Sequence, residues 1–291
     1  MIQKSEISRK VRQFQLISRK LVDSLFAGNY HSVFKGPGLE FHDVREYMPG
    51  DDARFIDWNV SSRTNVPYLK TFREEREMLL EIIVDVSSSL RIGSGEQSKL
   101  DVAGIVFALM GFSAVANNDR IGSVFFSDRV ESVISPMKGK KHVLRQISNL
   151  LSSSFEGKGS NLALALRSAS ENMKRRGIVV ILSDFKMSGY WKELSLLSRR
   201  HDVLAIRITD PLDWQFPKTG LIDLEDSETG EGLSVYGSSR RFRKEYEDFW
   251  ELQRINWLNG CRQCGVDTLE ISTEEEPAKK LLQFFERRKK K

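Results

Sequence analysis

The sequence predicts an α/β fold: a Rossmann-like, doubly wound and mostly parallel sheet, preceded by an N-terminal helix and an irregular extension with short strands. Two observations support this prediction. From Met78 onward, short apolar runs alternate with longer segments in which apolar residues recur every three to four positions. Several of the short runs are apolar throughout, which is typical of parallel strands covered by helices on both faces.

The chain is expected to have three segments. Residues 1–27 predict an amphipathic helix, because their apolar positions are spaced by three and four. Residues 28–77 are rich in Gly, Pro, Asp and Arg, which indicates irregular structure. Residues 78–291 contain the sheet. The short strands of the middle segment are expected near 39–47 and 66–73.

The elements of the third segment follow from its periodicity. A helix expected at 98–116 is apolar almost all round, which indicates that other elements cover it. The acidic stretch at 225–232 predicts a hairpin loop. Strands are expected at 78–85, 121–127, 130–134, 178–183, 203–208, 221–224, 233–236 and 266–271. Further helices are expected at 139–152, 161–175, 190–199, 239–260 and 277–288.

Composition describes an ordinary globular chain of 291 residues, 40% hydrophobic and 29% charged. No apolar run reaches the ~18 residues of a membrane span, and the N-terminus has no apolar signal-peptide core. The two cysteines, Cys261 and Cys264, are too close together to cross-link the fold. We therefore expect a cytoplasmic protein without a membrane span.

Five oxygen-bearing side chains follow the predicted strands or begin a helix. The strand at 78–85 ends in the pattern D-x-S-x-S, and the strand at 178–183 is followed by an Asp. Because ligands bind at the carboxyl edge of open α/β sheets, we expect these groups to converge there. Oxygen ligands suit a hard cation, Mg²⁺ or Mn²⁺. The predicted metal ligands are Asp85, Ser87, Ser89, Ser160 and Asp184.

The charge of this set predicts its partner. Where some of these groups act through water, two carboxylates and three neutral hydroxyls leave a divalent ion incompletely neutralised and with an open coordination position. An acidic group from outside would complete its coordination. The sequence therefore predicts a protein partner that supplies a carboxylate through a shared metal.

The same pattern resembles the metal-ion-dependent adhesion site of von Willebrand factor A domains. In that family the first Asp, two serines, a loop Thr and a second Asp hold the cation, and a ligand carboxylate completes it. Ser160 stands for the loop threonine, and Phe185 follows the second Asp where many members have Gly. The resemblance covers residues 78–271 and implies a von Willebrand factor A-like domain.

A second resemblance lies before the sheet. The dense run from Gly36 to Trp58, with PGDD at 49–52, is similar to the signature of the domain-of-unknown-function family fifty-eight. Members are often encoded near MoxR-type AAA+ ATPases, which implies a chaperone-like assembly role with such an ATPase. The family has no established catalytic activity. In residue terms, the arginines and acids of this run predict an ion-pair network that pins an irregular loop onto the sheet. A partner-docking surface is a second, compatible prediction for the same residues.

Other functions are less well supported. An Asp at a strand end beside Mg²⁺ is also found in phosphohydrolases of the haloacid-dehalogenase type, but these need D-x-D, and Ser87 occupies the place of the second acid. This Mg-dependent enzyme remains the alternative to a non-enzymatic module. No P-loop string is present. The basic positions of the first helix are expected to be a solvated face, not a nucleic-acid site.

Overall fold

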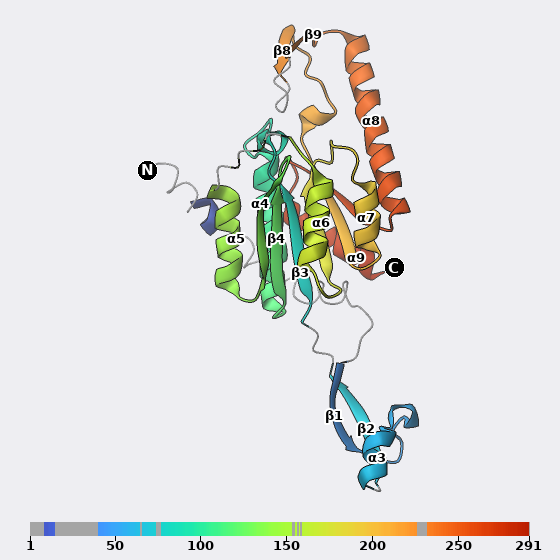
Figure 1. The fold of residues 1–291 in the computed structure, drawn as a ribbon. Coiled ribbons are helices and arrows are strands. Elements are labelled where there is room, and N and C mark those ends of the chain that lie inside the picture. The colour runs from blue at the N-terminus through green and yellow to red at the C-terminus, as the bar shows by residue number, and fades with distance from the viewer. Residues whose placement is uncertain are drawn as a thin grey trace. The chain divides into compact units, whose positions relative to one another are not determined.

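The computed structural model describes residues 9–14, 40–64, 66–73, 77–152, 155, 157, 159–225 and 232–290 (Figure 1). The chain divides into two compact units, Lys35–Glu77 and the remainder. Of the predicted N-terminal helix, residues 9–14 are described and helical, and they belong to the larger unit. The rest of that helix lies outside the described residues.

The larger unit contains a six-stranded sheet with the order β10-β7-β6-β3-β4-β5. Every neighbouring pair is parallel except β4 and β5, which form an antiparallel edge. The predicted α/β fold with a mostly parallel sheet is confirmed. The strands are β3 (Leu79–Asp85), β4 (Arg120–Phe126), β5 (Val130–Met137), β6 (Ile178–Ser183), β7 (Asp202–Thr209) and β10 (Asp267–Ser272).

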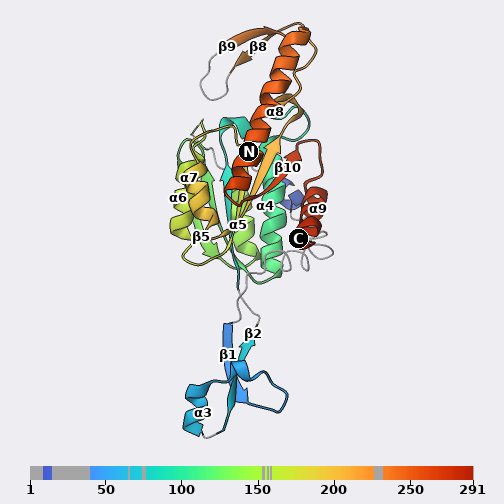
Figure 2. The ribbon, with the colours of Figure 1, turned by 90° about the vertical axis from the view of Figure 1, so that its right-hand side faces the viewer.

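Helices cover both faces of this sheet (Figures 1 and 2). Side chains alternate along the buried strands. On β3, Ile82 and Val84 join one hydrophobic core and Ile83 joins the other. Helices α4 (Lys99–Ala116), α5 (Lys140–Ser152) and α9 (Pro277–Lys289) pack into the first core; helices α6 (Leu162–Asn172), α7 (Trp191–Ser198) and α8 (Arg240–Gln263) pack into the second.

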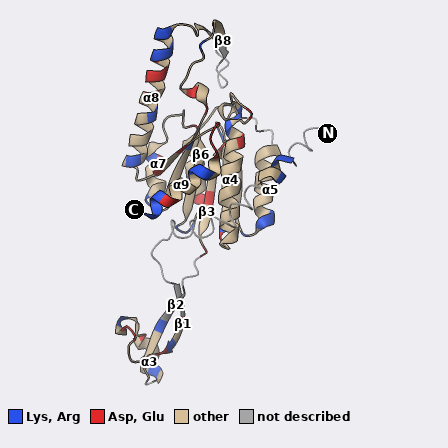
Figure 3. Ribbon diagram, turned by 180° about the vertical axis from the view of Figure 1, so that it is seen from behind, with Lys and Arg blue, Asp and Glu red and all other residues tan. Residues whose placement is uncertain are grey.

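Helix α4 lies in the middle of the first layer and carries almost no charged side chains, as Figure 3 shows. Ser98 and Asp101 form a capping box at its start. Its outer side is covered by Phe14; a Cβ on Gly104 would come 2.8 Å from that ring, so the glycine permits the close approach. Within the described residues, α4 alone is long and apolar enough to cross a membrane, and 78% of it is buried here as the central helix of this core.

The strand order places the predicted ligands. β3 pairs with β4 on one side and with β6 on the other, so the chain reverses its direction of strand addition between β3 and β6. Val84 lies opposite Leu182, and Asp85 and Ser183 therefore end adjacent strands. This is the topological switch point at which α/β sheets bind ligands.

The smaller unit is an antiparallel pair with a short helix. Arg45 binds Asp51 through two hydrogen bonds of 2.6 and 2.8 Å, and Arg54 pairs with Asp52. These ion pairs join arginines and acids of the predicted run within the smaller unit. The elements are β1 (Glu40–Glu46), η2 (Ala53–Phe55), α3 (Trp58–Thr64) and β2 (Tyr68–Arg73). In the larger unit, β8 (Leu221–Glu225) and β9 (Gly232–Tyr236) form the predicted hairpin.

Candidate metal centre

Asp85 is the last residue of β3 and is completely buried. Its Oδ1 accepts a hydrogen bond from the backbone N–H of Ser87 at 3.0 Å. Its Oδ2 accepts hydrogen bonds from the hydroxyls of Ser160 and Ser183, both at 2.8 Å. Residues from three separate parts of the chain thus meet at one carboxylate. Sequence reasoning included Ser160 but missed Ser183, which the pairing of β3 with β6 brings to the same oxygen.

The two serines of the D-x-S-x-S pattern lie next to each other. Their Oγ atoms are 3.2 Å apart, at the start of η3 (Ser88–Arg91). Ser87 precedes this helical turn, but its hydroxyl makes no capping hydrogen bond. Its hydroxyl contacts Ser89 instead of capping the turn.

Asp184 follows β6 and is only 2% exposed. Its Oδ2 lies 3.1 Å from the ammonium of Lys99, the first residue of α4. Lys99 is itself buried and also pairs with Asp213 at 3.1 Å. Burial alone would lower the pKa of Lys99, but Asp184 and Asp213 together raise it above its usual value.

Sequence reasoning missed this lysine and its second carboxylate. The sequence does single out the lysine, since Lys99 is one of two charged residues in the mostly apolar segment 99–116. The identity of its partners depends on tertiary structure alone.

Asp85 has a different electrostatic environment. Burial raises its pKa to about 6, and the nearby charge of Asp184 adds to the effect; hydrogen bonds from Ser87 and Ser183 oppose it. Among the residues that the structure describes, no lysine, arginine or histidine pairs with this carboxylate. A buried carboxylate without a cation is unfavourable, and a bound cation would relieve this cost.

The donor set fits a hard divalent cation. Three serine hydroxyls and the Asp85 carboxylate are oxygen donors within one cluster. The described residues contain no group of three or more His, Cys, Asp or Glu side chains arranged for a metal, so any site here would depend on the serines. Lys99 occupies one oxygen of Asp184, so that residue would act through its other oxygen.

Phe185, which directly follows Asp184, has a left-handed backbone conformation with φ of 55°. This region favours glycine, the residue at this position in many proteins with the resembling motif. Here the phenylalanine ring is buried between two other aromatic rings. Its centroid lies 5.1 Å from the ring centroid of Trp257 and 6.1 Å from that of Tyr190. Packing of the ring therefore stabilises a conformation that the backbone disfavours.

The cysteine pair lies away from this cluster. Cys261 is buried in α8, and Cys264 follows the helix as its C-cap. Both thiols are free, and burial raises the pKa of Cys261 to about 12, which keeps it protonated.

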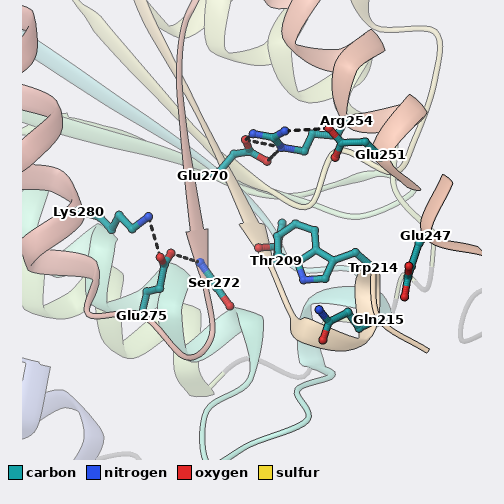
Figure 4. Close-up of a pocket in the computed structure, with 10 residues that line it drawn as sticks. All are labelled: Thr209, Trp214, Gln215, Glu247, Glu251, Arg254, Glu270, Ser272, Glu275 and Lys280. Atoms are coloured by element: carbon teal, nitrogen blue, oxygen red, sulfur yellow. Dashed lines mark hydrogen bonds and ion pairs between the residues drawn. The ribbon is translucent and has the colours of Figure 1, made fainter. Parts of the chain in front are cut away.

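A cavity of about 560 Å³ lies near the ends of β7 and β10 (Figure 4). Most of the charged side chains that line it are paired with one another. Arg254 bridges Glu270 and Glu251, while Lys280 pairs with Glu275. This cavity includes none of the predicted metal ligands.

Comparisons with known proteins add the following. The family described as "Protein of unknown function DUF58" matches residues 43–255. The uncharacterized protein Rv1480 of Mycobacterium tuberculosis is 27% identical over 289 residues, which covers 98% of this chain and 90% of the relative.

Solved structures with a similar fold include the conserved hypothetical protein BatB from Bacteroides thetaiotaomicron, with a TM-score of 0.46 and 11% identity over 74% of this chain and 100% of that one. Another is a von Willebrand factor type A structure from Catenulispora acidiphila, with a TM-score of 0.40 and 11% identity over 77% of this chain and 44% of that one. The family assignment rests on the match of the family itself, which spans most of the sequence. The chain belongs to the DUF58 family of proteins of unknown function.

Proposed function

We propose that this protein is a non-enzymatic, metal-dependent binding module. Asp85, Ser87, Ser89, Ser160 and Asp184 would hold Mg²⁺ or Mn²⁺, and a carboxylate of a protein partner would complete the coordination. The observation that carries this proposal is the buried Asp85 carboxylate, which is bound by hydroxyls and an amide but by no described cationic side chain.

The chain's own groups support binding more than catalysis. A cation at this site would supply a positive centre that attracts an acidic group. The serine hydroxyls that now donate to Asp85 or to each other have lone pairs that can turn toward a cation. The hydrogen bond from Lys99 holds Asp184 in place, so the site does not depend on metal for the position of that carboxylate.

The proposed partner is a MoxR-type AAA+ ATPase, with which the protein would act in chaperone-like assembly or maturation in the cytoplasm. Support for this comes from the resemblance of the 36–58 segment and from membership of the DUF58 family. An acidic side chain of the ATPase, or of a shared client, would be the carboxylate that the metal receives.

Calorimetric titration with MgCl₂ and MnCl₂ tests the metal. We expect the wild type to bind one ion and Asp85→Ala to bind none. Asp248→Ala removes an exposed carboxylate of α8 and is the matched control, which should bind like the wild type. Absence of binding in the wild type, or equal binding by Asp85→Ala, would refute the proposal.

Capture of the partner tests the function. The wild type and Asp184→Ala would be used to retain a purified MoxR-type ATPase with Mg²⁺ and with a chelator. The proposal is supported if the wild type retains the ATPase with Mg²⁺ but not with the chelator, and the variant does not retain it. It is contradicted if retention is the same with the chelator and in the variant.

Turnover of a phosphate ester distinguishes the enzymatic alternative. Ser87 stands where a haloacid-dehalogenase-type enzyme needs its general acid, and its hydroxyl contacts Ser89. We therefore expect no metal-dependent hydrolysis of p-nitrophenyl phosphate. Hydrolysis that is lost in Asp85→Ala would favour the enzyme instead.

A further inference from the structure

Arg207 is a charged residue at a position that is otherwise occupied by the hydrophobic core. It lies on β7, on the same face as Val203 and Ala205, which belong to the core beneath α7 and α8. Only 4% of its surface is exposed. An arginine at such a position is costly unless its donors find acceptors.

Two of its nitrogen atoms, Nε and Nη1, have no hydrogen-bond acceptor among the described residues. The carboxylate of Glu270 is 3.8 Å from Nη1, too far for a hydrogen bond, and Glu270 is already held by Arg254 at 2.9 Å. The ring of Trp257 lies 5.6 Å from the guanidinium carbon, which gives a cation–π contact but no acceptor.

Arg207 lines a cavity of about 280 Å³, and its Nε and Nη1 atoms are buried in the wall. The cavity lies among Arg207, the segment that follows β6 and one side of α8, and half of its lining residues are aromatic. Trp257 also lines it, and the indole N–H of that residue is buried without an acceptor among the described residues. A volume near the lower limit of ordinary ligand pockets, ~300 Å³, suits a small group.

The charge of the cavity is positive. No Asp or Glu lines it, whereas Lys186 does, with its ammonium 4.6 Å from the ring centre of Trp250. The same ammonium binds Asp213 at 2.7 Å, so that nearby carboxylate is already paired. Arg207 is therefore the cationic lining residue that has donors without a hydrogen-bond acceptor among the described residues.

We propose that this cavity binds a carboxylate carried on an aromatic group. One buried guanidinium suits a single negative charge, the indole N–H adds a second donor, and the aromatic walls suit a planar apolar body. The source is either a free aromatic acid or the C-terminal carboxylate of a peptide that ends in an aromatic residue. This site shares no residue with the proposed metal ligands, and its occupation does not require a metal.

Calorimetry and tryptophan fluorescence, both in the presence of EDTA, test this inference with phenylacetate as the probe. We expect phenylacetate to bind at least about tenfold more tightly than phenylacetamide, which lacks the charge, and than acetate, which lacks the ring. N-acetylglycyl-phenylalanine distinguishes the sources: tighter binding than phenylacetate indicates a peptide terminus, and weaker binding indicates a free acid.

The test variant is Arg207→Gln, in the cavity wall. The matched control is Arg262→Gln, which removes an exposed arginine from α8. The first should weaken phenylacetate binding by at least about tenfold, and the second should leave it unchanged. Circular dichroism checks that both are folded; should Arg207→Gln unfold, the comparison of acid with amide on the wild type decides alone. No binding of phenylacetate, equal binding of acid and amide, undiminished binding by folded Arg207→Gln, or equal competition by inorganic phosphate would overturn the inference.

Discussion

At the scale of single residues, the site is defined by an imbalance of charge. Asp184 has a cationic partner in Lys99, whereas Asp85 has only hydroxyl and amide donors among the described residues. Both carboxylates are buried at adjacent strand ends. The difference in partners explains why burial and the neighbouring charge raise the pKa of Asp85 to about 6.

This pKa predicts how stability depends on pH in the metal-free protein. Because the folded pKa of Asp85 lies above its unfolded value of 3.8, folding takes up a proton between these values. The contribution of Asp85 is most favourable below pH 4 and is lost as the pH rises to about 6, by about 3 kcal/mol. Denaturant titrations in EDTA at pH 4.5 and pH 7 cover most of this range and should show a loss of about 2 kcal/mol from Asp85.

The comparison variant is Asp85→Asn, which has no proton to lose. It should lack this part of the pH dependence, while the part due to Glu81, whose pKa is raised by burial to about 8, stays. A wild type and variant with parallel pH profiles would contradict the assignment.

The backbone at Phe185 gives a second prediction at this scale. Removing the buried ring should destabilise the protein by about 3 kcal/mol. Because φ is positive, Phe185→Gly should nevertheless be about 1 kcal/mol more stable than Phe185→Ala, the reverse of the usual order. Thermal or denaturant unfolding of the two variants provides the measurement, and a more stable alanine variant would show that the position is unstrained.

At the scale of elements, an ion pair connects helix α4 to the end of strand β6. Lys99 is the first residue of the helix, directly after the N-cap Ser98, and reaches Asp184 and Asp213. A lysine at a helix N-terminus opposes the helix dipole, so local propensity does not explain it. Its function is therefore to compensate the buried carboxylates.

Lys99→Met should accordingly destabilise the protein by about 3–5 kcal/mol, since it leaves buried charge without a partner. Asp213 keeps its bond to Lys186, so most of the loss comes from Asp184. The double variant Lys99→Met with Asp184→Asn should recover part of that stability in denaturant unfolding at pH 7. If the two substitutions were simply additive, the ion pair would not be the cause.

At the scale of the whole molecule, the doubly wound order of the larger unit creates both candidate sites. The change of direction between β3 and β6 opens the carboxyl edge where Asp85 lies. The layer of α7 and α8 on β7 encloses Arg207. The two sites therefore come from different features of one sheet.

Protection from hydrogen exchange should follow the same architecture. Strands β3, β4, β6 and β7 each pair on both sides and are covered on both faces, so their amides should exchange most slowly. The β8–β9 hairpin, with Leu221 and Tyr236 exposed, should exchange fastest among the paired strands. Mass spectrometry of exchanged peptides measures this order, and equal protection of hairpin and central strands would contradict it.

The sequence by itself determined the positions of the strands and helices of the larger unit. Their periodicity is local: Ile83 and Val84 belong to opposite faces because side chains alternate along any strand. It also determined that Asp85 ends a strand, because the apolar run stops there. Metal binding by Asp85 and the other predicted ligands stays a prediction.

Only the tertiary structure decided which charges meet. Lys99 and Asp184 are 85 positions apart, and nothing in either local segment indicates that they pair. Ser183 likewise reaches Asp85 because β6 lies beside β3. Two nitrogen atoms of Arg207 are buried without an acceptor among the described residues because of what the fold packs around β7. The physical reason is that burial and pairing of a charge depend on what the fold places around it, whereas periodicity depends only on the chain near it.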